Sequence, residues 1–205
     1  MNIGIMGGTF DPIHLAHLAV AEEAKRQVNL NKVIFIPAGK PWLKDDSYIT
    51  PAETRVQMLQ LALSDKLDFE ISTMEIERPG FTYTIDTIRE MKTHNEPDDE
   101  LFLIMGYGSL AEMPEWREPV LLIELCRLIV APRLGLSAPD MKSLEEVIPG
   151  ITNKVVFLDR PEMDISASEI RENVRRGLSV SRMVPEKVDE YINLHGLYVS
   201  GKEDE

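Results

Sequence analysis

The stretch Gly7-Gly8-Thr9-Phe10-Asp11-Pro12-Ile13-His14-Leu15-Ala16-His17 decides the fold that this sequence predicts. It follows an apolar run at residues 3–6 and precedes a second one at residues 18–21, an order that predicts a strand, a tight turn and a helix. The two glycines allow a ligand to approach the backbone closely because they carry no Cβ. The free N–H groups at the start of the helix suit an anion such as phosphate.

His14 and His17 are the candidate catalytic residues of this stretch. They are three positions apart at the start of the predicted helix, so their side chains share one face. Two imidazoles beside a phosphate-sized opening can hydrogen-bond its oxygens while charge shifts during a transfer. A zinc pair and ordinary surface histidines are the alternatives, and the preceding glycine turn makes both less consistent with the sequence.

Length and composition predict one domain with its own core. The chain has 205 residues, of which 43% are hydrophobic, and a chain of this size can bury a sizeable apolar interior. We expect residues 1–205 to form a single domain, with a helical C-terminal part at about residues 165–197. The polar tail at residues 200–205 is expected to be flexible.

The charge balance limits the partners that this chain can have. Its net charge is −13, and no basic stripe is present that could replace the counterions of a nucleic acid, so we expect no DNA or RNA partner. Neither a signal peptide nor an apolar run of membrane-spanning length is found. The single Cys126 lies in an apolar run, where a buried and unreactive thiol is expected. We therefore expect a cytoplasmic protein without a membrane partner; the oligomeric state stays open, a homo-oligomer included.

Alternating apolar and amphipathic segments predict an α/β fold with a doubly wound parallel sheet. Strands are expected at residues 2–6, 32–37, 69–72 with 74–76, 101–105, 128–131 and 154–158. Helices are expected at residues 15–28, from a cap at Thr50 to about 64, over about ten residues ending near 94, and at 116–125, 143–147, 164–177 and 185–194. Ligands bind outside the carboxyl ends of parallel strands, which here are the turns after residues 6, 36 and 105.

Ile165-Ser166-Ala167-Ser168-Glu169-Ile170-Arg171 is the second candidate motif. Either serine can cap the helix that begins here. A cap alone does not require two hydroxyl groups and an arginine one turn later. Together these donors converge on a helix N-terminus, which is a suitable site for a polyphosphate.

Gly106-Tyr107-Gly108-Ser109-Leu110-Ala111 is a competing motif, because it fits the Gly-x-Gly-x-x-Ala dinucleotide-binding fingerprint after a strand. That fingerprint requires an acidic residue about 20 positions later, at the end of the next strand. Residues 127–133 read Arg-Leu-Ile-Val-Ala-Pro-Arg and contain no acid. The missing acidic residue counts against the hypothesis that the chain is an NAD-dependent dehydrogenase.

Residues 7–17 resemble the His-x-Gly-His nucleotidyltransferase superfamily, and more closely its bacterial nicotinate mononucleotide adenylyltransferases. Residues 83–87 are similar to the Tyr-Thr-x-Asp-Thr segment of that branch, residues 113–116 to its Leu-Pro-x-Trp, and residues 165–171 to its Ile-Ser-Ser-Thr-x-Ile-Arg. Two positions depart from the family pattern. Ala16 stands where the family usually has glycine, and Gly108 stands where it usually has an aspartate near the ATP ribose or the metal-bound phosphates.

The resemblance implies a Rossmann-like nucleotidyltransferase fold and transfer of AMP from ATP to nicotinate mononucleotide, giving deamido-NAD and pyrophosphate in NAD biosynthesis. It implies in-line attack without a covalent intermediate, Mg²⁺ carried on ATP, and catalysis by His14 and His17. The implied ATP-binding residues are Gly7, Gly8, Thr9, Phe10, Lys44, Gly106, Gly108, Ile165, Ser166, Ser168 and Arg171. The implied mononucleotide-binding residues are Tyr83, Thr84, Trp116 and Arg133.

Two alternatives stay open beside this hypothesis. The first is transfer to another phosphate acceptor, such as nicotinamide mononucleotide or phosphopantetheine. The second is a catalytically weakened nucleotide-binding protein, which the departures at Ala16 and Gly108 would favour.

Overall fold

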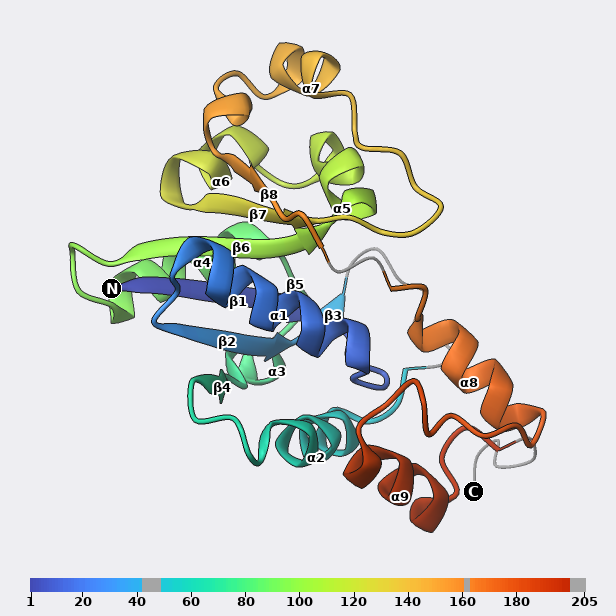
Figure 1. Cartoon of the computed structure of the whole chain (residues 1–205). Coiled ribbons are helices and arrows are strands. Elements are labelled where there is room, and N and C mark those ends of the chain that lie inside the picture. The colour runs from blue at the N-terminus through green and yellow to red at the C-terminus, as the bar shows by residue number, and fades with distance from the viewer. Residues whose placement is uncertain (42–48, 161–162, 200–205) are drawn as a thin grey trace.

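A six-stranded parallel sheet forms the centre of the computed structural model, which describes residues 1–41, 49–160 and 163–199 (Figure 1). The strand order is β4-β2-β1-β6-β7-β8. The six strands are β1 (Asn2–Gly8), β2 (Lys32–Pro37), β4 (Phe69–Ile71), β6 (Glu100–Gly106), β7 (Arg127–Ala131) and β8 (Val155–Phe157). Two short strands, β3 (Lys40–Pro41) and β5 (Phe81–Thr82), pair in parallel beside it. The predicted doubly wound parallel sheet is confirmed.

Helices cover both faces of the sheet, and alternate strand residues face opposite cores. Ile3 and Ile5 of β1 belong to one buried cluster, whereas Met6 belongs to the other. The first face is covered by α4 (Thr84–His94), α5 (Tyr107–Glu112), α6 (Pro119–Leu125) and α7 (Met141–Val147). The second is covered by α1 (Leu15–Val28), α2 (Ala52–Leu63), α8 (Ala167–Arg175) and α9 (Glu186–His195). Burial on both faces explains why the central strands are continuous apolar runs.

The sheet changes winding direction at β1, which pairs with β2 on one side and β6 on the other. Ile5 is aligned with Ile34 of β2 and with Leu103 of β6. The chain therefore builds outward from β1 in one direction and later returns to its other side. Such a switch point leaves a crevice at the carboxyl ends of the strands, where α/β proteins bind ligands.

Residues 74–76 are a helix and not the strand that the sequence predicts. They belong to α3 (Met74–Glu77), a single helical turn whose residue Ile76 donates its backbone N–H to Thr73. One turn is too short to display a 3.6-residue period, so the alternation of apolar and acidic residues imitates a strand. The turn directs Glu75 inward, where it is buried.

The predicted helix at residues 116–125 is also wrong in its first part. A 3₁₀ turn occupies Met113–Glu115, Trp116 is extended, and α6 begins only at Pro119. Proline disfavours helical geometry in the residue before it, and Glu118 has a positive φ of 52°. Likewise Thr50 does not cap α2: the cap position is Pro51, and the Thr50 backbone N–H is donated to Asp11.

Cys126 is buried as expected, and burial raises the pKa of its thiol to about 12.

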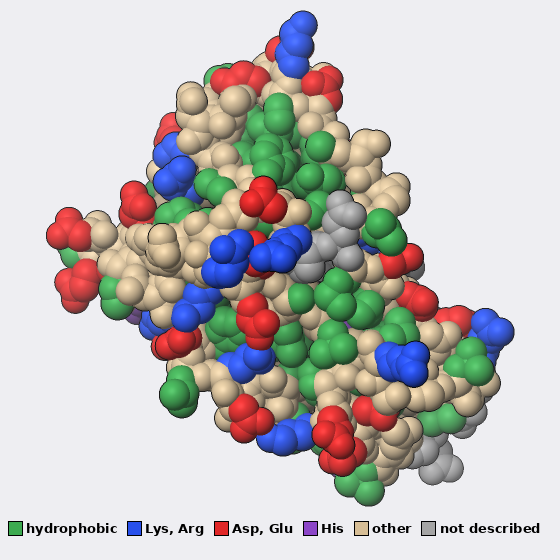
Figure 2. Space-filling view, viewed as in Figure 1, with side chains coloured by type: hydrophobic (Ala, Val, Ile, Leu, Met, Phe, Trp, Pro, Cys, Tyr) green, Lys and Arg blue, Asp and Glu red, His purple; other side chains and the backbone are tan. Residues whose placement is uncertain are grey.

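Acidic and basic side chains are interspersed over the face shown in Figure 2, so this face carries no single charged patch. No helix within the described ranges is long and apolar enough to cross a membrane.

The close contact between Gly39 and α3 gives a test of this packing. A Cβ added at Gly39 would lie 2.0 Å from the carbonyl oxygen of Glu75, so we expect Gly39→Ala to lower the free energy of unfolding by about 1–3 kcal/mol. Gly108 is the matched control, since nothing lies within 4 Å of a Cβ added there. Gly108→Ala lies in α5 and should keep or raise stability by up to about 1 kcal/mol. Urea unfolding of both variants measures this, and wild-type stability in Gly39→Ala would contradict the described contact.

Candidate active site

A cavity of about 940 Å³ opens at the carboxyl ends of β1, β6 and β7. It brings together most of the residues that the sequence singles out, although these are spread over 165 positions of the chain. Those that line it are Gly7, Gly8, Thr9, Phe10, His14, His17, Thr84, Gly106, Trp116, Arg133, Ile165, Ser166, Ser168 and Arg171. Tyr83 and Gly108 are not among the lining residues, and Lys44 lies outside the described residues. Ala16 also lines the cavity.

The two histidines are stacked on each other at the start of α1. Their ring centroids are 3.6 Å apart and their planes differ by 19°. The backbone N–H of His14 donates to Nδ1 of His17 at 3.3 Å. Because Nδ1 accepts this bond, a neutral His17 carries its proton on Nε2. The spacing of three that the sequence shows thus produces a face-sharing pair with one fixed tautomer.

His14 is uncharged at neutral pH in this structure. Burial, and to a smaller extent the positive charge of Arg133, lower the pKa of His14 from 6.5 to about 4. The side chain lines the cavity and the residue is 5% exposed. Its Nδ1 atom is buried and has no hydrogen-bond partner among the described residues. A bound anion beside His14 would raise this pKa by cancelling the repulsion from Arg133.

Phe10 acts as a support for the histidines. It has a positive φ of 51°, is 2% exposed, and meets the His17 ring edge-on at 5.1 Å. A Cβ at Gly8 would lie 3.1 Å from the Phe10 ring, whereas nothing lies within 4 Å of a Cβ added at Gly7. The two glycines therefore have different roles. The absence of a Cβ at Gly8 allows the Phe10 ring to pack there, and its absence at Gly7 leaves the cavity open.

Arg55 supports the loops beside this site, and sequence reasoning misses it. It projects from α2, is 2% exposed, and donates hydrogen bonds to the backbone carbonyls of Thr9, Ala38 and Thr50 at 2.8–2.9 Å. These three carbonyls come from three separate loops. One arginine within an amphipathic helix is typical of a solvent-facing residue, so no signal in the sequence distinguishes it.

The N-terminus of α8 forms another wall of the cavity. Ser166 caps the helix, accepting a hydrogen bond from the backbone N–H of Glu169 at 3.2 Å. Arg171 donates to the backbone carbonyl of Asp11 at 2.7 Å and to Ser168 Oγ at 3.4 Å. The predicted cap is confirmed, and Arg171 additionally connects α8 to the turn that precedes the histidines.

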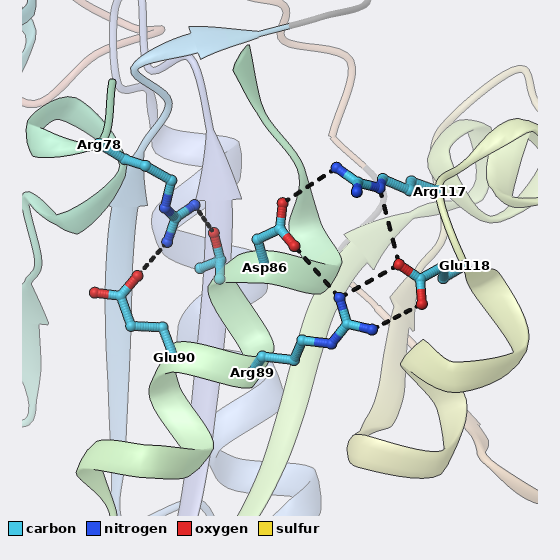
Figure 3. Close-up of polar contacts among 7 residues, drawn as sticks. Arg78, Asp86, Arg89, Glu90, Arg117 and Glu118 are labelled. Atoms are coloured by element: carbon cyan, nitrogen blue, oxygen red, sulfur yellow. Dashed lines mark hydrogen bonds and ion pairs between the residues drawn. The ribbon is translucent and has the colours of Figure 1, made fainter. Parts of the chain in front are cut away.

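Glu75 is a buried acid that lines the cavity and that sequence reasoning also misses. It accepts a hydrogen bond from the Thr87 hydroxyl at 2.6 Å. Arg78 donates to the same hydroxyl and pairs with Glu90 (Figure 3). Burial raises the pKa of Glu75, and the bond from Thr87 opposes that shift. This network fixes one side of α4 close to Thr84.

A second ion-pair network fixes the other side of α4 (Figure 3). Arg89 pairs with Glu118 at 2.7 Å and with Asp86 at 3.4 Å, and Arg117 lies 3.6 Å from Asp86. The Arg117 guanidinium also stacks over the Tyr83 ring, 4.9 Å from its centroid. These contacts join the start of α4 to the segment that follows Trp116, so the two predicted mononucleotide segments are held as one unit.

Comparison with known proteins agrees with this geometry. The Cytidylyltransferase-like family model matches residues 5–173. A protein of Dehalococcoides mccartyi strain BAV1 named "Probable nicotinate-nucleotide adenylyltransferase" is 44% identical over 97% of both chains. This chain belongs to the nicotinate-nucleotide adenylyltransferase family. A family member of Roseiflexus sp. strain RS-1 is 40% identical over 96% of this chain and 97% of its own.

The fold of this family is also found among solved structures. The nicotinic acid mononucleotide adenylyltransferase of Plasmodium falciparum, solved in complex with NaAD, superposes with a TM-score of 0.80. The match covers 96% of this chain and 97% of that chain at 20% sequence identity. At this identity the match shows that the two chains share a fold. Family membership and the six-residue length of α5 after Gly106 both count against the dehydrogenase hypothesis.

The buried, neutral His14 predicts a pH-dependent stability. Its pKa is lower in the folded state than in the unfolded chain, so the unfolded state binds more protons between about pH 6.5 and 4. Stability from this group is therefore complete above pH 6.5 and is lost as the pH falls toward 4. The 2.5-unit difference corresponds to a loss on the order of 3 kcal/mol.

Urea unfolding across this pH range, with His14→Asn as the matched control, measures that effect. The variant lacks the titrating group and keeps His17, His94 and His195. We expect the stability difference between wild type and variant to shrink as the pH falls. Parallel pH profiles for the two proteins would contradict burial of a neutral His14.

Proposed function

We propose that this chain transfers the adenylyl group of ATP to nicotinate mononucleotide, giving deamido-NAD and pyrophosphate. The observation that carries the proposal is that the histidine pair, the α8 N-terminus, Thr84 and Trp116 line one and the same cavity. Membership in the nicotinate-nucleotide adenylyltransferase family supports it. A cytoplasmic location remains a prediction of the sequence.

The reaction is an in-line displacement at phosphorus. A phosphate oxygen of the mononucleotide attacks the α-phosphorus of ATP, the new P–O bond forms, and the bond to the bridging oxygen of pyrophosphate breaks. His17 would donate a hydrogen bond from its Nε2–H to the oxygens on which charge develops, and His14 would hold the same phosphates. The histidines would thus stabilise charge and would form no covalent intermediate.

The triphosphate of ATP would lie at the α8 N-terminus, with Ser166, Ser168 and Arg171 as donors. The Gly7–Phe10 turn would pass beneath it, and Lys44 stays a predicted phosphate ligand. Mg²⁺ would arrive as part of the MgATP substrate and would neutralise charge on the leaving pyrophosphate. The described residues contain no group of three or more His, Cys, Asp or Glu side chains that could hold a metal ion.

The mononucleotide would lie between Trp116 and the start of α4. Trp116 offers a flat aromatic face to a pyridine ring. Thr84 begins α4, so the positive end of an 11-residue helix meets the cavity there and suits a ring carboxylate. The Trp116 backbone N–H is donated to Met113 at 3.0 Å, so backbone donors for the carboxylate would come from the α4 side.

Pyrophosphate release tests the proposal directly. Purified protein is supplied with ATP and Mg²⁺ and with nicotinate mononucleotide, nicotinamide mononucleotide or phosphopantetheine in turn. We expect turnover with the nicotinate compound. Turnover with phosphopantetheine alone, or with none of the three, would contradict the proposed activity.

Acceptor choice should favour the acid over the amide by at least about tenfold in kcat/KM. Hydrogen bonds to charged groups are worth roughly 1.5–3 kcal/mol against 0.5–1.5 for neutral ones, and about 1.4 kcal/mol corresponds to tenfold. Trp116→Ala should weaken the binding of both acceptors by a similar factor, because the indole ring would stack on either pyridine ring. A ratio near one, or a ratio lost in Trp116→Ala alone, would mean that the acceptor end discriminates by other contacts.

Removal of the His17 imidazole should reduce kcat about 10²–10³-fold, the typical cost of losing one donor to developing charge. KM for ATP should change much less, since the interaction grows in the transition state. His195→Ala is the matched control, because His195 ends α9 and does not line the cavity. Steady-state kinetics of correctly folded His17→Ala with near-normal kcat would remove His17 from the chemical step.

A further inference from the structure

The segment after α9 returns to the turn that precedes the histidines. α9 ends at His195, its C-cap Gly196 has a φ of 56°, and Tyr198 follows with a φ of 64°. The Tyr198 hydroxyl donates to Asp11 Oδ1 at 2.7 Å, across 187 positions of sequence. The sequence predicts nothing of this contact, since a tyrosine near a polar tail is typical of a surface residue.

Asp11 is the point where four parts of the chain meet. It is 3% exposed and lines the cavity between Phe10 and His14. Its Oδ2 accepts the backbone N–H of Thr50 at 3.1 Å, and its backbone carbonyl accepts Arg171 Nη1 at 2.7 Å. A buried carboxylate requires such donors. Loss of the Tyr198 hydroxyl would leave one of its oxygens without this donor.

The same C-terminal region also holds the other side of the histidine turn. The backbone N–H of Leu15, the residue after His14, donates to the carbonyl of Met183 at 2.9 Å. Segments from beyond residue 170 therefore contact the chain both before and after His14. Burial, and next the charge of Asp11, raise the pKa of Tyr198, so its hydroxyl stays a proton donor throughout the physiological pH range.

We propose that Tyr198 is a positioning residue, which fixes the turn carrying His14 and His17 through its hydrogen bond to Asp11. The inference rests on the proposed function, because its main consequence is for the rate of adenylyl transfer. Catalytic geometry is sensitive to small displacements, and a shift of about 1 Å in a supporting group costs up to about 10²-fold in rate. A packing role for the Tyr198 ring is the competing explanation, since that ring also packs against the buried cluster beneath α1.

Tyr198→Phe separates the two explanations, because it keeps the ring and removes the hydroxyl. We expect kcat to fall about tenfold, with KM for ATP and for the mononucleotide within about twofold of wild type. Tyr191→Phe is the matched control: Tyr191 lies on α9 with its ring 4.2 Å from that of His195, away from the cavity. Wild-type kcat in Tyr198→Phe, whatever its Tm, would overturn the proposal.

A double-mutant cycle tests whether the effect passes through Asp11. In an Asp11→Asn background the charge-assisted bond is already lost, so adding Tyr198→Phe should lower kcat by less than about threefold. If the fold-reductions in kcat of the two single variants multiply fully in the double variant, Tyr198 acts by a route other than Asp11. That result would overturn the inference.

Histidine ring NMR supplies a readout that does not depend on turnover. Tyr198→Phe should shift the imidazole signals of His14 and His17 more than those of His94 and His195. Unchanged His14 and His17 signals would overturn the inference even for a protein with no measurable activity. An inactive wild type with the predicted shifts would contradict the proposed function alone, so the two failures are distinguishable.

Discussion

The guanidinium group of Arg55 donates to the backbone carbonyls of Thr9, Ala38 and Thr50, which belong to the loops after β1, after β2 and before α2. Each of the three loops lies beside the opening of the cavity. The three carbonyls lie outside strands and helices, so no regular backbone hydrogen bond satisfies them. Removal of one partner from a buried hydrogen bond costs about 1–3 kcal/mol for each group left unsatisfied. This one side chain therefore connects α2 to the histidine turn and to the loop after β2, in addition to the hydrogen bond from the Thr50 N–H to Asp11.

The sheet and most helices follow from the sequence because their signals are local. Continuous apolar runs at β1, β2, β6 and β7 predict strands buried on both faces, and the glycine turn after β1 marks the start of α1. The errors fall where a signal is shorter than its period or where a distant partner intervenes. Residues 74–76 form one helical turn, Trp116 precedes the proline-started α6, and the Thr50 N–H is taken by Asp11.

The residues of the candidate site also divide into those that local sequence motifs predict and those that distant contacts define. His14, His17, Ser166 and Arg171 can be predicted because short motifs place chemically suitable residues at helix N-termini. Arg55, Glu75 and Tyr198 cannot, because the role of each is defined by a partner 12 to 187 positions away in the sequence. Asp11 belongs to both groups: the motif contains it, and only the folded chain shows that it joins the loop before α2, helix α8 and the segment after α9.

The charges around the cavity explain how an acidic chain can suit anionic nucleotides. The acids that line it among the described residues are Asp11 and Glu75, and each accepts hydrogen bonds from neighbouring protein groups. Arg133 also lines the cavity and makes no ion pair with another described residue, yet its charge reaches His14 and lowers the pKa there. A phosphate beside Arg133 would cancel that repulsion and favour a proton on His14. An arriving anion, and not a described carboxylate of the free protein, would thus provide the counter-charge for Arg133 and for a proton on His14.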